Sequence, residues 1–126
     1  MGGDLRRDPF PDFERTIPIG RQFRTRNGGE AVLLSIDLWS DRIMLHFAYE
    51  VTTPRLMGRE GQPQFIGWSV TDDLGTSYRW GAGGGGGSDG FHHGYATVRP
   101  GVPDAANKLV ITTPELSEPI EVQLAP

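Results

Sequence analysis

The sequence contains no cysteine among its 126 residues. The chain can therefore form neither a disulfide framework nor a thiolate metal site, and such a composition suits a reducing compartment. No stretch approaches the roughly eighteen consecutive apolar residues that a membrane-spanning helix needs. The opening segment, MGGDLRRDPFPDF, lacks the apolar core of a secretory signal. Together these absences predict a cytoplasmic protein without a membrane span.

Positive charge is scarce as well. Lys and Arg number 12 against 16 Asp and Glu, which gives a formal net charge of −4, and Lys108 is the only lysine. Neither half of the chain carries a basic patch that could neutralise the phosphates of a nucleic acid. We therefore expect no nucleic-acid partner.

Helical periodicity is also missing, since no window of eleven or more residues repeats its apolar positions every 3.6 residues. Residues 30–39 and 43–50 instead alternate in polarity on either side of a short Ser40-Asp41 turn. This pattern predicts a β-hairpin with one buried face.

Each run of this hairpin offers a set of alternate apolar residues for the core. The expected core-facing residues are Val32, Leu34, Ile36, Leu38, Ile43, Leu45, Phe47 and Tyr49. Trp39 falls on the opposite face at the end of the first run. If it is exposed beside Leu33, the two would form a contact patch.

The segment WSVTDDLGTSYRW predicts a second hairpin. Residues 72–76 suit a type I turn with a glycine bulge, and the first aspartate caps that turn. This register places Val70 opposite Tyr78 and Trp68 opposite Trp80. Both tryptophans are expected in the core.

The remaining strand signals are at residues 91–98, in KLVITTP and in PIEVQLAP. About seven or eight strands with no long helix predict an all-β fold, an antiparallel immunoglobulin-like β-sandwich. A small β-barrel is the alternative. Residues 1–12 are expected to form a polar arm, and residues 13–126 a single sandwich domain.

The stretch GAGGGGGSDG, residues 81–90, contains five consecutive glycines and matches two functional motifs by chance of composition. A dinucleotide site needs a helix after G-x-G-x-x-G, and a P-loop needs a Lys followed by Ser or Thr; neither follows here. The G-x-S-x-G match at Ser88 lacks the rigid strand-to-helix elbow of a hydrolase. The tract is therefore predicted to be a connecting loop over the end of the sandwich.

Histidines offer little for a metal site. His92 and His93 are adjacent, so on a strand they point to opposite faces, and the spacing of His46 from them in space is unknown. No H-x-H or H-x-x-x-H pattern occurs. Calcium coordination by Asp72, Asp73 and Asp89 has no EF-hand spacing to support it. We expect neither a bound metal nor a cofactor.

The order of these features resembles a known pattern. WSVTDDLGTSY fits W-x-V-x-D-D-x-G-T-x-Y, and a glycine-rich stretch, a strand and a proline-bearing connection into KLVIT follow it. In this respect the chain resembles uncharacterised bacterial β-sandwich proteins of the immunoglobulin-like type, over residues 17–125. The resemblance implies a fold and assigns no catalytic residue.

The predicted function is that of a non-catalytic binding or accessory module, with a protein partner or a second copy as its ligand. Contacts would come from the loops at 52–64 and 81–90 or from an exposed sheet face. The candidate ligand-binding residues are Trp39, Phe91, His92, His93 and Tyr95. A carbohydrate- or metal-binding accessory domain and a small hydrolase are the alternatives.

Overall fold

The computed structural model describes residues 9–25, 28–50, 67–88 and 90–124. Over this part of the chain the fold is all-β, with eight strands and no helix. The strands are β1 (Phe13–Arg24), β2 (Glu30–Trp39), β3 (Ile43–Glu50), β4 (Ser69–Asp72), β5 (Arg79–Ser88), β6 (Phe91–Arg99), β7 (Lys108–Thr112) and β8 (Ile120–Gln123). The predicted strand content is confirmed.

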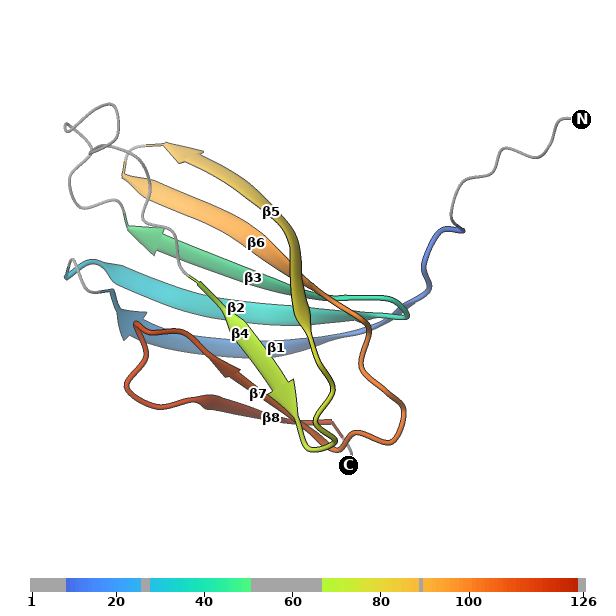
Figure 1. Cartoon of the computed structure of the whole chain (residues 1–126). Coiled ribbons are helices and arrows are strands. Elements are labelled where there is room, and N and C mark those ends of the chain that lie inside the picture. The colour runs from blue at the N-terminus through green and yellow to red at the C-terminus, as the bar shows by residue number, and fades with distance from the viewer. Residues whose placement is uncertain (1–8, 26–27, 51–66, 89, 125–126) are drawn as a thin grey trace, which may run out of the picture.

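The strands form two antiparallel sheets that face each other (Figure 1). The larger sheet has the order β1-β2-β3-β6-β5, and the smaller sheet has the order β4-β7-β8. The fold is therefore a β-sandwich, and the alternative of a small barrel is wrong because the sheets do not close into one.

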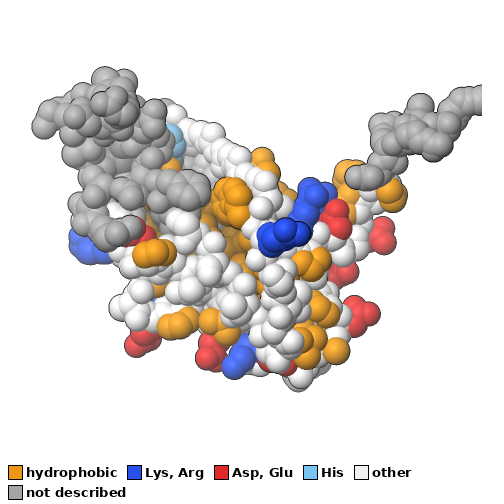
Figure 2. Space-filling view, in the orientation of Figure 1, with side chains coloured by type: hydrophobic (Ala, Val, Ile, Leu, Met, Phe, Trp, Pro, Cys, Tyr) orange, Lys and Arg blue, Asp and Glu red, His pale blue; other side chains and the backbone are white. Residues whose placement is uncertain are grey.

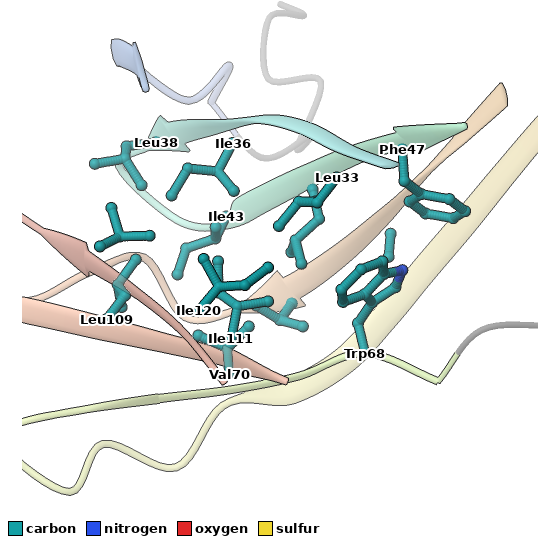
Figure 3. Close-up of a cluster of buried hydrophobic side chains, with 14 of the residues drawn as sticks. Leu33, Ile36, Leu38, Ile43, Phe47, Trp68, Val70, Leu109, Ile111 and Ile120 are labelled. Carbon is teal, nitrogen blue, oxygen red and sulfur yellow. The ribbon is translucent and has the colours of Figure 1, made fainter. Parts of the chain in front are cut away.

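Apolar side chains from both sheets meet between them (Figure 3). Six of these are the largest fully buried side chains of the described chain: Leu33, Ile36, Ile43, Leu45, Leu109 and Ile111. Trp68 is buried at one end of the core, with ring centroids 5.9 Å from Phe23 and 5.6 Å from Phe47. The expectation that Trp68 belongs to the core is confirmed.

The β2–β3 hairpin forms as predicted, but the buried face of β2 changes along the strand. Leu33 pairs with Phe47 and Ser35 pairs with His46, so Leu34 is an extra residue in a β-bulge. Leu33 and Ile36 are consequently buried, while Leu34 is exposed. The predicted core positions of Val32 and Leu34 and the predicted exposure of Leu33 are wrong, because one inserted residue reverses the alternation.

The turn at residues 72–76 forms, but it does not close a hairpin. Gly75 has a φ of +80°, the left-handed conformation expected of it. β4 pairs with β7 in the smaller sheet, and β5 pairs with β6 in the larger one, so the turn carries the chain between sheets. The predicted pairs of Val70 with Tyr78 and of Trp68 with Trp80 are therefore wrong.

Asp72 organises this turn as predicted. Its Oδ1 accepts hydrogen bonds from the backbone N–H of Leu74 at 2.9 Å and of Thr76 at 3.1 Å, and the hydroxyl of Tyr78 donates to Oδ2 at 2.8 Å. Burial is the largest single influence and opposes ionisation. The hydrogen bonds from Thr76, Tyr78 and Leu74 together outweigh it and lower the pKa of Asp72 to about 2.

The glycine tract is a strand and not a loop. β5 pairs with β6 from Arg79 opposite Arg99 to Ser88 opposite Phe91, with one register shift between Trp80 and Ala82. Glycine is a poor strand former, but a backbone ladder needs no side chains once a partner strand is in place. The predicted connecting loop at 81–90 is wrong, because the neighbouring strand overrides the local preference of the sequence.

Candidate binding surface

The outer face of the larger sheet carries exposed aromatic side chains along β6. Phe91 is 58% exposed and Tyr95 is 37% exposed, and the exposed His93 lies between them on the same face. In register, Phe91 is opposite Glu50, His93 opposite Ala48, and Tyr95 opposite His46 on β3. We define the binding surface as Phe91, His93 and Tyr95 together with the neighbouring edge strand β5.

On the other side of β6, the tract Gly83–Gly87 runs beside these residues with no side chains of its own, and it is exposed along its length. Tyr95 lies against Gly84, where a Cβ atom would be 3.2 Å from the Tyr95 ring. A Cβ at Gly86, opposite His93, would meet no atom within 4 Å. The strip next to His93 is therefore open backbone, and the strip next to Tyr95 is covered by its ring.

The edge strand is open on its second side as well. β5 is the last strand of its sheet, and no other strand in the described ranges pairs with its outer edge. Figure 1 shows β5 along the border of the larger sheet. An exposed edge presents unpaired N–H and C=O groups that can pair with an extended chain.

A shallow hollow adjoins Phe91 at one end of this surface. Its lining is mostly apolar and includes Val32 and Ala48 from β2 and β3, with Glu30 and Glu50 at the same end. Glu50 is held in place because its Oε1 accepts a hydrogen bond from the backbone N–H of Glu30 at 3.0 Å. The hollow extends the aromatic surface across the sheet.

The two adjacent histidines point to opposite faces, as predicted. His92 is half-buried and stacks on Tyr49, with ring centroids 5.6 Å apart and planes 20° apart, whereas His93 is exposed on the outer face. Their ring nitrogens therefore cannot converge on one ion. In the part of the chain that the structure describes, no group of three or more His, Cys, Asp or Glu could hold a metal.

Trp39 lies at the far end of the same sheet. Its ring packs edge-on against Phe10 at 6.0 Å and Phe13 at 5.2 Å, and it is half-buried. The length of β6 separates its end of the sheet from Phe91, about 25 Å at strand rise. Of the five predicted ligand-binding residues, the structure brings together Phe91, His93 and Tyr95, and it places His92 and Trp39 elsewhere.

The outer face also carries a polar cluster that the sequence did not single out. Asp37 on β2 contacts His46 on β3 through Oδ2 and Nε2 at 2.8 Å, and the hydroxyl of Thr16 on β1 donates to Asp37 Oδ1 at 2.6 Å. The register of the β2–β3 hairpin could have predicted this contact, because Asp37 is opposite Met44, two residues from His46.

An Asp–His pair can orient an imidazole for proton transfer. Such a reaction also needs a nucleophile that contacts the second ring nitrogen. Among the described residues no hydroxyl hydrogen-bonds to that nitrogen of His46. The cluster is consistent with a cross-strand polar contact that fixes the side chains next to Tyr95.

Residues 52–64 lie outside the described ranges, as does Asp89, and Ser88 ends β5. In the described part of the chain, no helix is long and apolar enough to cross a membrane.

Comparison with known proteins gives support for the fold. No family model matches the sequence, and a search of curated proteins finds no match. Among solved structures, the crystal structure of the conserved domain protein from Bacillus anthracis is similar, with a TM-score of 0.56 and 23% sequence identity. The similarity covers 79% of this chain and 34% of that one, so the present chain spans about a third of that protein's length. At this identity the likeness shows a shared fold alone.

Proposed function

We propose that this protein is a non-catalytic binding module that accepts an extended polypeptide segment along β5. The observation that carries this proposal is the combination of an exposed edge strand, bare from Gly83 to Gly87, with the exposed aromatic residues Phe91 and Tyr95 on the adjacent strand. Strand addition at a sheet edge obtains affinity from backbone hydrogen bonds and specificity from side-chain contacts nearby.

The glycines support this proposal physically. An incoming chain can approach a backbone that carries no side chains more closely than it can approach an ordinary strand. Natural sheets block their edges with lysines, prolines or bulges, and the tract Gly83–Gly87 carries no such blocking residue. The aromatic rings and the hollow beside Phe91 would then select among the extended segments that reach the edge.

The partner is a protein segment, either from another protein or from a second copy of this chain. The kinship with bacterial immunoglobulin-like sandwiches, carried by the WSVTDDLGTSY motif, and a cytoplasmic location form part of the same proposal. Peptide binding along β5 can be tested without knowing the family or the location, because the exposed edge belongs to this domain.

The test is selection of peptides that bind the edge. A phage-displayed library of random peptides is panned on the immobilised protein, and the enriched peptides are titrated against the wild type and two variants. Gly86→Lys adds a charged side chain in open space on the edge strand, and Gly67→Lys adds the same side chain in open space outside β5. Enriched peptides should bind Gly86→Lys about tenfold more weakly or worse, and should bind Gly67→Lys as they bind the wild type.

Two results would count against the proposal. Panning could enrich no peptide, or the enriched peptides could bind Gly86→Lys and the wild type equally. Sedimentation velocity over a concentration series identifies the other occupant, since a dimer that Gly86→Lys alone abolishes would show that a second copy pairs with β5.

A further inference from the structure

The edge strand β5 differs from one end to the other in what it presents on the outer face of the sheet. Gly86 lies opposite His93 near the end of β5, and Arg79 lies opposite Arg99 at its beginning. In Figure 2 the border of the molecule that β5 forms is mostly white, and Lys or Arg side chains gather beside one end of it. A segment added at this edge therefore meets bare backbone at one end and positive charge at the other.

Gly86 marks a place where the added segment has room for a large side chain. The neighbouring outward glycine, Gly84, is already covered, since a Cβ there would lie 3.2 Å from the Tyr95 ring. A Cβ at Gly86 would meet no atom within 4 Å. An aromatic side chain on an adjacent strand stabilises an edge glycine by covering it. The open space over Gly86 therefore favours an aromatic residue directly opposite it in the partner.

Arg79 has no acidic partner among the described residues. Its neighbour across the β5–β6 ladder is Arg99, and like charges directly opposite each other destabilise a sheet. The pKa of Asp41 is lowered by a hydrogen bond from Arg42 and by the charges of Arg42 and Arg99, so this carboxylate is already engaged. Arg79 itself is exposed. An acidic residue on its free side would supply the favourable pair that the sheet does not provide.

The register of β5 sets the spacing between these two contacts. β6 advances six residues over the same span, from His93 opposite Gly86 to Arg99 opposite Arg79. An antiparallel strand on the free edge needs the same advance, and an even number keeps both side chains on the outer face. Antiparallel pairing is also slightly more stable than parallel pairing. In this direction the segment passes Gly86 first, so its aromatic residue precedes its acidic residue.

We propose that the partner of the β5 edge is a segment of another protein in which an acidic residue follows an aromatic residue by six positions. This inference rests on the proposed function and specifies the chemistry of the partner. The aromatic side chain covers Gly86, and the carboxylate pairs with Arg79. No aromatic residue of the present sequence has Asp or Glu six positions after it. A second copy of the chain therefore lacks the pattern, and the partner is a different protein.

Isothermal titration of synthetic peptides tests the pattern. The parent peptide has about ten residues that alternate Thr and Val, with a Trp and, six positions later, a Glu on the same face. Matched peptides replace Glu by Lys, replace Trp by Thr, move Glu to four positions after Trp, or exchange Trp and Glu. The Lys peptide should bind about tenfold more weakly than the parent, and each of the others about threefold more weakly or worse.

Charge reversal at Arg79 identifies the residue that reads the acidic side chain. Arg79→Glu should weaken binding of the parent peptide about threefold to tenfold and strengthen binding of the Lys peptide by a similar factor. Arg24→Glu is the matched control, because Arg24 is an exposed arginine of β1, at the opposite border of the same sheet. This variant should bind both peptides as the wild type does.

NMR gives the position of the aromatic side chain. Because a ring shields protons that lie over its face, the Trp of the parent peptide should move the Gly86 signals upfield. The peptide with Thr in place of Trp should leave these signals without the upfield shift. An upfield shift at other residues and none at Gly86 would contradict the proposed register.

The outcomes separate this inference from the proposed function. If all the peptides bind equally and Gly86→Lys weakens each of them, the edge binds extended segments and the proposed pattern is wrong. The pattern is also wrong if Arg79→Glu leaves the preference for Glu over Lys unchanged. If no peptide binds, or if Gly86→Lys weakens none of them, the proposed function and this inference are both wrong.

Discussion

The β2–β3 and β5–β6 pairs belong to the same sheet and are both antiparallel, yet different groups hold them together. In β2–β3, buried side chains from both strands enter the core, including Leu33, Ile36 and Leu45, each with 0% exposure. In β5–β6, the tract Gly83–Gly87 has no side chains and so contributes none to the core. The first pair is stabilised mainly by apolar burial, and the second depends on its backbone and on the neighbouring aromatic rings.

The difference shows two ways in which register can be specified. In β2–β3, a shift by one residue would move apolar side chains from the core to solvent. In β5, close approach replaces packing, because a Cβ at Gly83 would lie 2.9 Å from the Trp80 ring and one at Gly85 would lie 2.5 Å from the carbonyl oxygen of His93. Particular glycines are therefore required where a ring or a backbone takes up the space.

The largest expected effect is in the β2–β3 pair. Leu45→Ala removes a fully buried side chain and should lower the free energy of unfolding by about 2–5 kcal/mol. The measurement is urea unfolding at equilibrium. Leu34→Ala on the partner strand is the matched control, because Leu34 is 42% exposed and its loss should change stability by less than about 0.5 kcal/mol. Equal effects at both positions would contradict the bulge at Leu34.

A pair of substitutions within the glycine tract tests whether close approach specifies β5. Gly83→Ala should destabilise the protein by about 1–3 kcal/mol, since its Cβ would lie 2.9 Å from both the Trp80 ring and the backbone oxygen of Tyr95. Gly86→Ala should stabilise it by about 0.4–1 kcal/mol, because the Cβ has open space and the unfolded chain loses freedom. Thermal unfolding of the two variants gives the answer, and effects of the same sign would show that the tract does not pair in this register.

A further effect, smaller than that of Leu45→Ala, concerns the turn that delivers the chain to β5. The pKa of Asp72 is lowered to about 2 in the folded protein from an ordinary value of 3.8. Its contribution to stability is therefore full above about pH 4 and is lost as the pH falls through about 2. Asp72→Asn should cost about 1–2 kcal/mol at pH 7 and should reduce the loss of stability between pH 4 and pH 2.

Denaturant unfolding at several pH values checks this prediction. Asp73→Asn is a suitable control, because it changes the adjacent carboxylate, which accepts hydrogen bonds from the backbone N–H groups of Asn107 and Lys108 instead. If Asp72→Asn leaves the slope of stability against pH unchanged, then its turn does not depend on the ionised carboxylate.

Much of the fold could be predicted from local pattern. The alternation in residues 30–39 and 43–50 gave the hairpin, Trp68 was correctly assigned to the core, and Asp72 was correctly assigned to its turn. These features depend on residues close in sequence or on the pattern of polar and apolar residues. Both are visible in the sequence.

The errors arose where a distant strand decided the outcome. Trp80 was expected in the core and is exposed, because β4 and β5 pair with different sheets and not with each other. Among the predicted site residues, Trp39 could not be separated from Phe91 without the strand order. The position of Arg79 opposite Arg99 could not be predicted either, since only the β5–β6 register brings the two residues together.

The sequence by itself determined an all-β chain, because its polarity alternates along extended runs and no helical period occurs. It also determined that the segment at 81–90 would have almost no side chains, but not what that segment does. Only the tertiary structure decided that this segment is a strand, since β6 supplies the hydrogen-bonding partner and Trp80 and Tyr95 cover the glycines. A run of glycines has only a weak intrinsic conformational preference, so the neighbouring strand and rings determine its conformation.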